Sequence, residues 1–131
     1  MKPLVVVGTR KKSVARATIS EGKGIVRVNK RLLDNIKPEM AKMKMQEPLL
    51  IAEDLAKKYD IHVNVFGGGV ISQADAVRLA IAKALVATNS KLRQEFLVYD
   101  RTLLVADVRQ RESRKPNTHG NARGKTQKSY R

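Results

Sequence analysis

The chain has 131 residues, a mass of 14.6 kDa and a formal net charge of +15. Its hydrophobic content of 42% is enough for one modest core, so we expect a single folded domain. It has no cysteine, which excludes structural disulfides and thiolate zinc sites, and no apolar run that predicts a membrane span or a secretory signal. We therefore expect a soluble, cytoplasmic protein.

The positive charge is concentrated at the two ends of the chain. Residues 1–31 carry nine lysines and arginines against Glu21, a net +8, and residues 109–131 carry eight against Glu112, a net +7. The stretch between these blocks is neutral. Two such blocks repel themselves and destabilise a compact state unless a polyanion relieves the repulsion, so the distribution favours a nucleic-acid partner.

The first part of the chain predicts β-structure. Residues 3–9 and 14–20 have strand patterns, and the glycines of residues 22–24 favour a tight turn. Residues 25–29 are predicted to return beside 14–20 as the second strand of a hairpin.

The middle of the chain predicts helices followed by a strand. A short helix is expected over residues 31–36, followed by a break at Lys37–Pro38 and a helical turn or two within residues 38–47. Pro48 suits the first turn of a further helix. Residues 61–66 alternate as a short strand.

The strongest helix pattern begins near Ser72, which together with Asp75 has the form of a capping box. Asn89–Ser90 can cap a following helix, and residues 102–107 predict a last, apolar strand. From Val108 onward no periodic pattern remains. We therefore predict a globular α/β domain over residues 1–107 and an extended basic tail over residues 108–131.

A glycine run, Gly67, Gly68 and Gly69, separates the strand at 61–66 from this helix. Bare backbone before a helix N-terminus often binds phosphate, which suggests a nucleotide-handling enzyme. However, the run matches neither GxxxxGK[ST] nor GxGxxG. The alternatives are a purely structural tight connection and a connection whose backbone also contacts RNA phosphate.

A second candidate site is the basic loop near the N-terminus. Arg10, Lys11 and Lys12 are consecutive, Ser13 can add a hydroxyl ligand, and Arg16 shares a strand face with Val14 and Thr18. Such a run is often only a solvated turn. With a second basic block in the same chain, RNA contact is the stronger interpretation.

No catalytic constellation is present in the sequence. His62 and His119 are far apart and offer no metal spacing, and the adjacent Glu53 and Asp54 point in different directions on a helix. We expect no enzyme activity, no cofactor and no metal.

Several blocks identify a family resemblance when taken together and in order: GTRKKSVARATI, GKGIVRVN, EPLL, FGGG with SQADAVRLAIAKAL, YDRTLLVADVR and the closing KSYR. They closely resemble the small-subunit ribosomal protein nine family over nearly the whole chain. KSYR and YDRTLLV resemble its archaeal and eukaryotic branch, with archaeal preferred. Departures are Ser72 and Val108, where relatives commonly have glycine and proline, and the PNTH stretch, which has fewer basic residues than many relatives.

The resemblance implies an α+β fold in which a mixed β-sheet packs with helices, like domain two of ribosomal protein five, with a left-handed βαβ crossover. It also implies a structural role in the head of the small ribosomal subunit, beside neighbouring head proteins and without a membrane. The tail is expected to thread through rRNA and to reach P-site tRNA. The residues assigned to rRNA are Arg10, Lys11, Lys12, Ser13, Arg16, Gly67, Gly68, Gly69, Arg109, Arg111, Arg114, Lys115, Arg123 and Lys125. Those assigned to tRNA are Lys128, Ser129, Tyr130 and Arg131.

Two rival functions remain at this point. One is a phosphate-handling enzyme that uses the glycine run. The other is a general nucleic-acid or membrane-surface binder that uses its cationic ends. The tail cannot bury an apolar core, so we expect it to order only on binding its partner.

Overall fold

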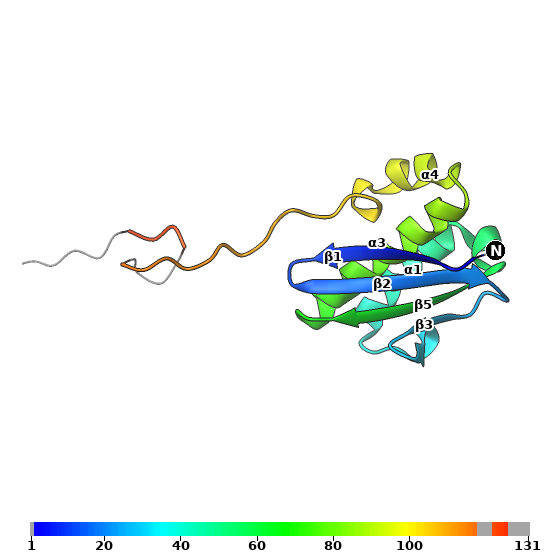
Figure 1. Cartoon of the computed structure of the whole chain (residues 1–131), viewed down its shortest axis with the longest axis horizontal. Helices are drawn as coiled ribbons and strands as arrows, with labels where there is room; N and C mark the ends of the chain where they lie inside the picture. Colours follow the sequence, from blue (N-terminus) through cyan, green and yellow to red (C-terminus); the bar gives the residue numbers. More distant parts are fainter. Residues whose placement is uncertain (1, 118–121, 126–131) are drawn as a thin grey trace, which may run out of the picture.

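The computed structural model describes residues 2–117 and 122–125. Five strands and the helices that cover them form one domain (Figure 1). The strands are β1 (Leu4–Arg10), β2 (Ser13–Glu21), β3 (Val26–Val28), β4 (Arg31–Leu32) and β5 (Tyr59–Phe66). The helices are α1 (Glu39–Ile51), α2 (Glu53–Ala56), α3 (Val70–Thr88) and α4 (Leu92–Tyr99), with short 3-10 turns η1 (Leu33–Asn35) and η2 (Arg101–Leu103).

The strands form one mixed sheet in the order β1-β2-β5-β3-β4. β5 lies antiparallel to β2 and parallel to β3, so the predicted hairpin between residues 14–20 and 25–29 is wrong. The turn is present, but β3 diverges from β2 because the more apolar β5, with Ile61, Val63 and Val65 buried, takes the central place. The expected mixed sheet is confirmed.

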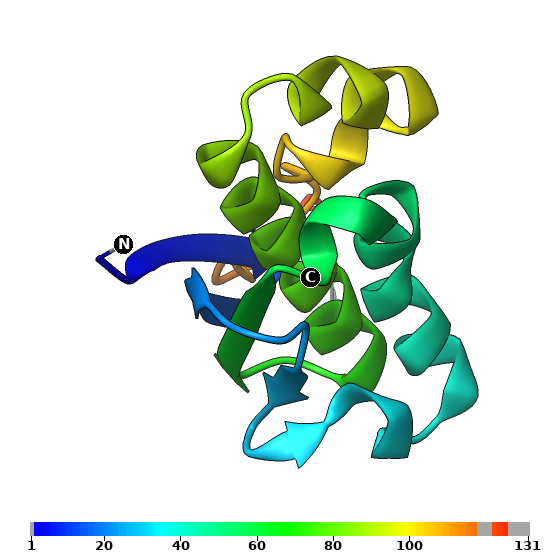
Figure 2. The same ribbon diagram turned by 90° about the vertical axis from the view of Figure 1, so that its right-hand side faces the viewer.

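The connection from β3 to β5 runs through α1 and α2 and forms a βαβ crossover. In the view of Figure 1, β5 and the parallel β3 point to the left, and the helices lie behind the sheet. Figure 2 shows the same arrangement from the side, with the helices on one side of the sheet. Going from β3 upward to β5 by way of the rear is a left-handed turn, as the resemblance implies.

The core lies between the sheet and α3, which packs on β1, β2 and β5. Small side chains let the layers approach closely. Ala15 and Ala17 of β2 face inward with no exposure. A side chain at Gly8 would collide with the α3 backbone at Ala76 and Ala80, so glycine is required where β1 passes under this helix.

Two helix boundaries differ from the sequence predictions. Pro48 does not open a helix but lies buried inside α1, near its C-terminal end, where the helix breaks briefly before α2. Ser72 is not a cap, because α3 already begins at Val70, with Gly69 at its N-cap and no side-chain cap. The apolar stripe of this helix is confirmed. The sequence did not show where the helix begins, because the glycines before it are compatible with many backbone conformations.

Two short segments were also assigned incorrectly. Of the short helix predicted over residues 31–36, only the 3-10 turn η1 is helical, because Arg31–Leu32 forms β4. Residues 102–107 form the end of η2 and irregular backbone instead of a strand, because Asp100 caps this turn by accepting a hydrogen bond from Thr102 N. Leu103 of this segment is fully buried beside α3, so the apolar run packs on a helix and does not pair with a strand.

After η2, the described residues 106–115 have no assigned helix or strand, and they run away from the domain (Figure 1). No helix within the described ranges is long and apolar enough to cross a bilayer. The division into residues 1–107 and a tail from 108 remains a prediction.

Candidate nucleic-acid interface

The tip of the β1–β2 hairpin and the glycine loop after β5 are packed together. Ser13 is fully buried, and its hydroxyl donates to the carbonyl of Gly67 at 2.9 Å. Gln73 of α3 donates to the same carbonyl at 3.1 Å. Ser13, predicted as a phosphate ligand, is therefore used inside the protein, where it ties the hairpin to the loop.

The three glycines differ in their surroundings. Gly67 and Gly68 have positive φ angles of 79° and 63°, and a Cβ at either position would collide with the Lys12 backbone or the Ser13 hydroxyl. Around Gly69 nothing lies within 4 Å of a Cβ position. The first two glycines are thus explained by the tight connection itself, and only the backbone at Gly69, just before α3, is open.

We expect Gly68→Ala to lower the free energy of unfolding by about 1–3 kcal/mol, because alanine is strained at positive φ and its methyl group meets Ser13. Gly69→Ala is the matched control and is expected to change it by less than about 0.5 kcal/mol. Urea unfolding followed by circular dichroism measures both values. Equal stabilities for the two variants would contradict the structural role of Gly68.

Arg10 is turned inward, toward α3 and the start of the tail. Its guanidinium lies 3.9 Å from Asp75 and 3.7 Å from Asp107, and it donates to the carbonyl of Arg109 at 2.9 Å. Only 15% of its side chain is exposed. Any contact of Arg10 with RNA competes with these carboxylates, so the geometry favours a role in holding the tail against the domain.

Asp107 is the acceptor at the root of the tail. Arg109 donates to it from the backbone N–H and from two guanidinium nitrogens, Nε and Nη2. The side-chain hydrogen bond from Arg109 lowers the pKa of Asp107 most, the backbone bond adds to this, and the charge of Arg10 also contributes. Asp107 is therefore ionised at neutral pH and keeps two arginines in place.

A second node, centred on Arg78 of α3, joins three elements. Arg78 is 11% exposed and contacts Glu47 of α1 at 2.6 Å and Asp100 at 3.1 Å, and it donates to the Thr102 hydroxyl at 3.1 Å. The backbone N–H of Thr102 lowers the pKa of Asp100 most, with the Thr102 hydroxyl and Arg78 adding to it. This node holds η2, the last turn before the tail, against the helices.

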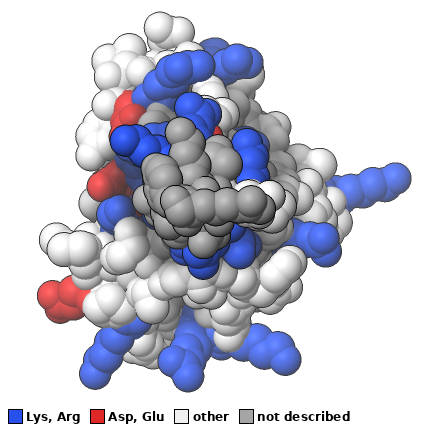
Figure 3. Space-filling view, turned by 90° about the vertical axis from the view of Figure 1, so that its left-hand side faces the viewer, with Lys and Arg blue, Asp and Glu red and all other residues white. Residues whose placement is uncertain are grey.

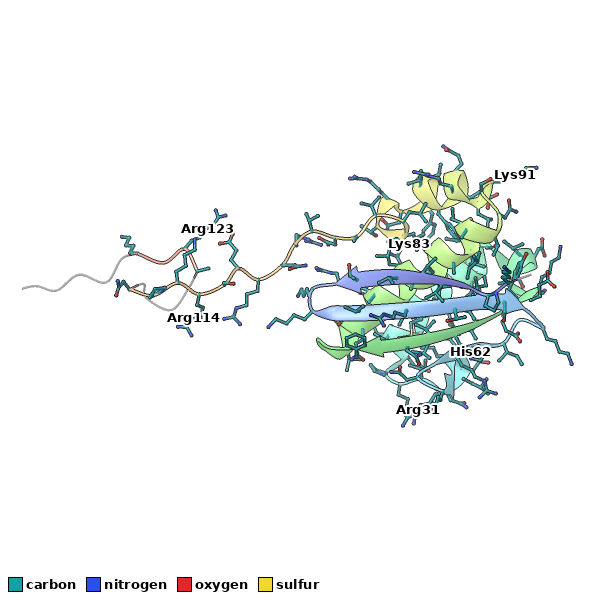
Figure 4. All side chains as sticks on the ribbon, in the orientation of Figure 1. Arg31, His62, Lys83, Lys91, Arg114 and Arg123 are labelled. Atoms are coloured by element: carbon teal, nitrogen blue, oxygen red, sulfur yellow. The ribbon has the colours of Figure 1, made fainter. Side chains whose placement is uncertain are left out.

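The remaining predicted cations are at the surface. Lys11 and Lys12 are exposed at the hairpin tip, Arg16 is exposed on β2, and Arg111 and Arg114 are exposed on the tail. Figure 3 looks at this end of the molecule and shows lysine and arginine side chains spread around it, with acidic ones on one side. Figure 4 shows Arg114 and Arg123 on the tail, well away from the domain. Lys115 and Lys125 belong to the same segment and are also exposed.

Arg123, like Arg109, has a carboxylate partner within the chain. Arg123 donates to Glu112 at 2.9 Å, with 83% of its side chain exposed, and such an exposed pair is easily exchanged for a phosphate. The four residues predicted to bind tRNA, 128–131, lie outside the described residues, as does His119. Within the described ranges, no group of three or more histidine, aspartate or glutamate side chains could hold a metal ion.

Sequence reasoning missed Arg78, Asp107 and Asp60. Asp60 accepts hydrogen bonds from the backbone N–H groups of Ile25 and Lys23, which lower its pKa and fix the turn between β2 and β3. An arginine in the apolar stretch of α3 was a signal for Arg78. No local signal marks the partners, because Asp60 and Lys23 are 37 residues apart in the chain and Asp107 and Arg10 are 97 residues apart.

Comparison with known proteins decides the family. The family described as "Ribosomal protein S9/S16" matches residues 8–131. This chain belongs to the ribosomal protein S9/S16 family. The curated "Small ribosomal subunit protein uS9" of Methanococcus maripaludis strain C7 is 45% identical over 134 residues, covering 100% of both chains. The uS9 protein of Halobacterium salinarum is 51% identical over 127 residues, covering 95% of this chain and 96% of its own length.

The family assignment confirms the resemblance seen in the sequence, and these S9/S16 relatives are archaeal, the branch preferred from the sequence. These relatives are named as a ribosomal protein and not as an enzyme. Together with Gly67 and Gly68 being required by the fold, this leaves the glycine loop without support as a nucleotide-handling site.

Proposed function

We propose that this chain is a structural, RNA-binding constituent of the small ribosomal subunit in the cytoplasm. The observation that carries the proposal is the full-length match to uS9 proteins, together with exposed cations at one end of the fold and along the tail. No catalysis is part of this function. Its partners are small-subunit rRNA and neighbouring proteins of the subunit head.

The basic end of the domain is assigned to rRNA phosphates. Lys11 and Lys12 are exposed beside the loop in which Gly69 leaves the start of α3 open and without a side-chain cap. Lysine side chains and free N–H groups at a helix start both favour phosphate. Arg16 adds a further cation, and Ser13, Gly67 and Gly68 act by shaping the loop.

The tail is assigned to rRNA through Arg109, Arg111, Arg114, Lys115, Arg123 and Lys125. Each cation that meets a phosphate releases condensed counterions, so the binding does not need an apolar contact area. The Arg10–Asp107 contact gives the tail a fixed origin on the domain. The last residues, Lys128, Ser129, Tyr130 and Arg131, are assigned to the backbone of P-site tRNA, where sequence-independent contacts suit a site that accepts every tRNA.

Removing residues 127–131 is expected to spare subunit assembly and to speed the dissociation of P-site tRNA roughly tenfold or more. Each charge-assisted hydrogen bond lost costs about 1.5–3 kcal/mol, which corresponds to a factor of about 10 or more. Purified subunits with labelled tRNA give the dissociation rate. A control with Lys128→Gln and Arg131→Gln keeps the length and tests charge alone. Dissociation at the unaltered rate from the truncated subunits contradicts the tRNA assignment.

A further inference from the structure

One face of the sheet is not covered by any described part of the chain. α3 packs on β1, β2 and β5 from a single side, and the views of Figures 1 and 2 agree that the helices lie on that side. Strand alternation and register place a row of exposed side chains on the opposite face, with His62 of β5 labelled in Figure 4; Val5, Thr9 and Leu32 lie at its margins. We call the following set the open face: Val7, Arg16, Arg27, His62, Asn64 and Phe66.

The open face combines apolar and hydrogen-bonding groups. Phe66 is 56% exposed and Val7 is 43% exposed. Arg16 pairs across the strands with Val7 on one side and Asn64 on the other. A sheet face that carries an aromatic ring beside amide, imidazole and guanidinium groups is a surface on which nucleic-acid bases can stack and form hydrogen bonds.

The two arginines of this face are not paired with carboxylates in the part of the chain that the structure describes. Within the described residues, neither Arg16 nor Arg27 has a carboxylate partner, whereas Arg10 and Arg78 on the covered side are both paired. Asp60, at the beginning of β5, accepts hydrogen bonds from Lys23 N and Ile25 N. The two free guanidiniums are two strands apart, roughly 12 Å between Cα atoms including the stagger along the strands.

We propose that the open face is a second rRNA-docking surface, which binds unpaired nucleotides with their bases against Phe66 and Val7 and their phosphates on Arg16 and Arg27. The inference rests on the proposed function and deepens it, because the basic end and the tail account for phosphate contacts only. Unpaired RNA is favoured over a duplex, because a duplex does not expose base faces for stacking. Free guanidiniums in place of an unbroken apolar surface favour RNA over a protein partner.

The open face is also continuous with the proposed phosphate-binding end. Phe66 pairs with Val14, next to the hairpin tip that carries Lys11 and Lys12, and it directly precedes the glycine loop. A strand of RNA held at that end can therefore continue onto the sheet without crossing a helix.

The test uses the full chain and a transcript of archaeal small-subunit rRNA, with affinity measured by filter binding from 50 to 400 mM KCl. The double variant Arg16→Gln/Arg27→Gln is expected to reduce the slope of log affinity against log salt by about 1.4, at about 0.7 for each contact with unpaired RNA. Phe66→Leu keeps an apolar side chain but removes the ring, and it is expected to weaken binding roughly 5- to 150-fold.

The matched control is Lys91→Gln/Arg93→Gln, which removes the same charge from exposed positions at the start of α4, away from the open face. Its salt slope is expected to equal that of the unaltered chain. Thermal unfolding by circular dichroism confirms that each variant is folded. Because Arg16 and Arg27 have no carboxylate partner among the described residues, no loss of stability is expected on their replacement.

The outcomes separate the two proposals. If the unaltered chain fails to bind the transcript, the proposed function is wrong. If it binds, and the arginine variant has the same salt slope as the unaltered chain, the open-face inference is overturned together with the assignment of Arg16 to an rRNA phosphate, while the rest of the proposed function stands. The inference is also overturned if Phe66→Leu binds as tightly as the unaltered chain, since an apolar side chain is then sufficient and stacking is not involved.

Discussion

A chain shortened after Arg109 is expected to lose most of the salt dependence of its rRNA binding. The deleted residues 110–131 contain seven lysines and arginines. If each meets a phosphate, the slope of log affinity against log salt falls by about 5, at about 0.7 per contact. A protein with that many contacts loses about a thousandfold in affinity between 50 and 200 mM salt, and the shortened chain is expected to lose far less. Filter binding across this range measures both slopes.

The truncation point keeps the contacts that hold the root of the tail. Asp107 and Arg109 remain, so the bonds from Arg10 to both of them are preserved. We therefore expect the thermal unfolding midpoint of the shortened chain to stay almost unchanged. A control of full length, with the seven cations replaced by glutamine, separates the effect of charge from that of chain length. If the salt slope is unchanged in both variants, the tail does not bind rRNA phosphates.

The largest loss of stability is expected from Arg78→Met. Removing one partner of a fully buried ion pair costs about 3–5 kcal/mol, because the opposite charge is left without compensation. Glu47 and Asp100 are 34% and 41% exposed and can regain water, which places the expected loss near the lower limit, about 3 kcal/mol. This corresponds to a fall in the unfolding midpoint of roughly 10 °C, measurable by circular dichroism.

Two further variants test the cause of this loss. Adding Glu47→Gln to Arg78→Met is expected to restore part of the stability, since it removes one of the carboxylates left unpaired. Arg93→Met, on the exposed surface of α4, is the control and is expected to have an effect below about 0.5 kcal/mol. If Arg78→Met lowers the free energy of unfolding no more than Arg93→Met does, the node does not hold η2 in place.

Elements with a strong local pattern were predictable from the sequence. Strands β1, β2 and β5 and the stripe of α3 follow from spacing alone, because the period of the apolar residues directly reports which side of an element is buried. The errors occurred where local chemistry was ambiguous. Pro48 suits the first turn of a helix, but it is also tolerated near the C-terminal end of α1, where the helix breaks. Residues 102–107 are apolar because they pack on a helix, not because they pair as a strand.

For the candidate site, residue types were predictable but their roles were not. Arg10, Lys11 and Lys12 are consecutive and look equivalent, yet Arg10 faces the covered side of the sheet and is held by carboxylates, whereas its neighbours are exposed. The strand ends between them, and Lys11 has a positive φ of 52° that turns the chain. The change in backbone direction at Lys11 thus gives the consecutive cations different roles: Arg10 makes internal contacts, and Lys11 and Lys12 lie at the surface.

The sequence by itself determined that the chain is a cationic α+β protein with a neutral middle and two basic ends, because charge and periodicity are properties of neighbouring residues. Only the tertiary structure decided that β5 separates β2 from β3, that Asp107 and Arg10 meet at the root of the tail, and that Arg16 and Arg27 share a face. Each of these depends on contacts between segments far apart in the chain. Which distant segments meet is set by how all the apolar faces are buried together, and no local pattern encodes that choice.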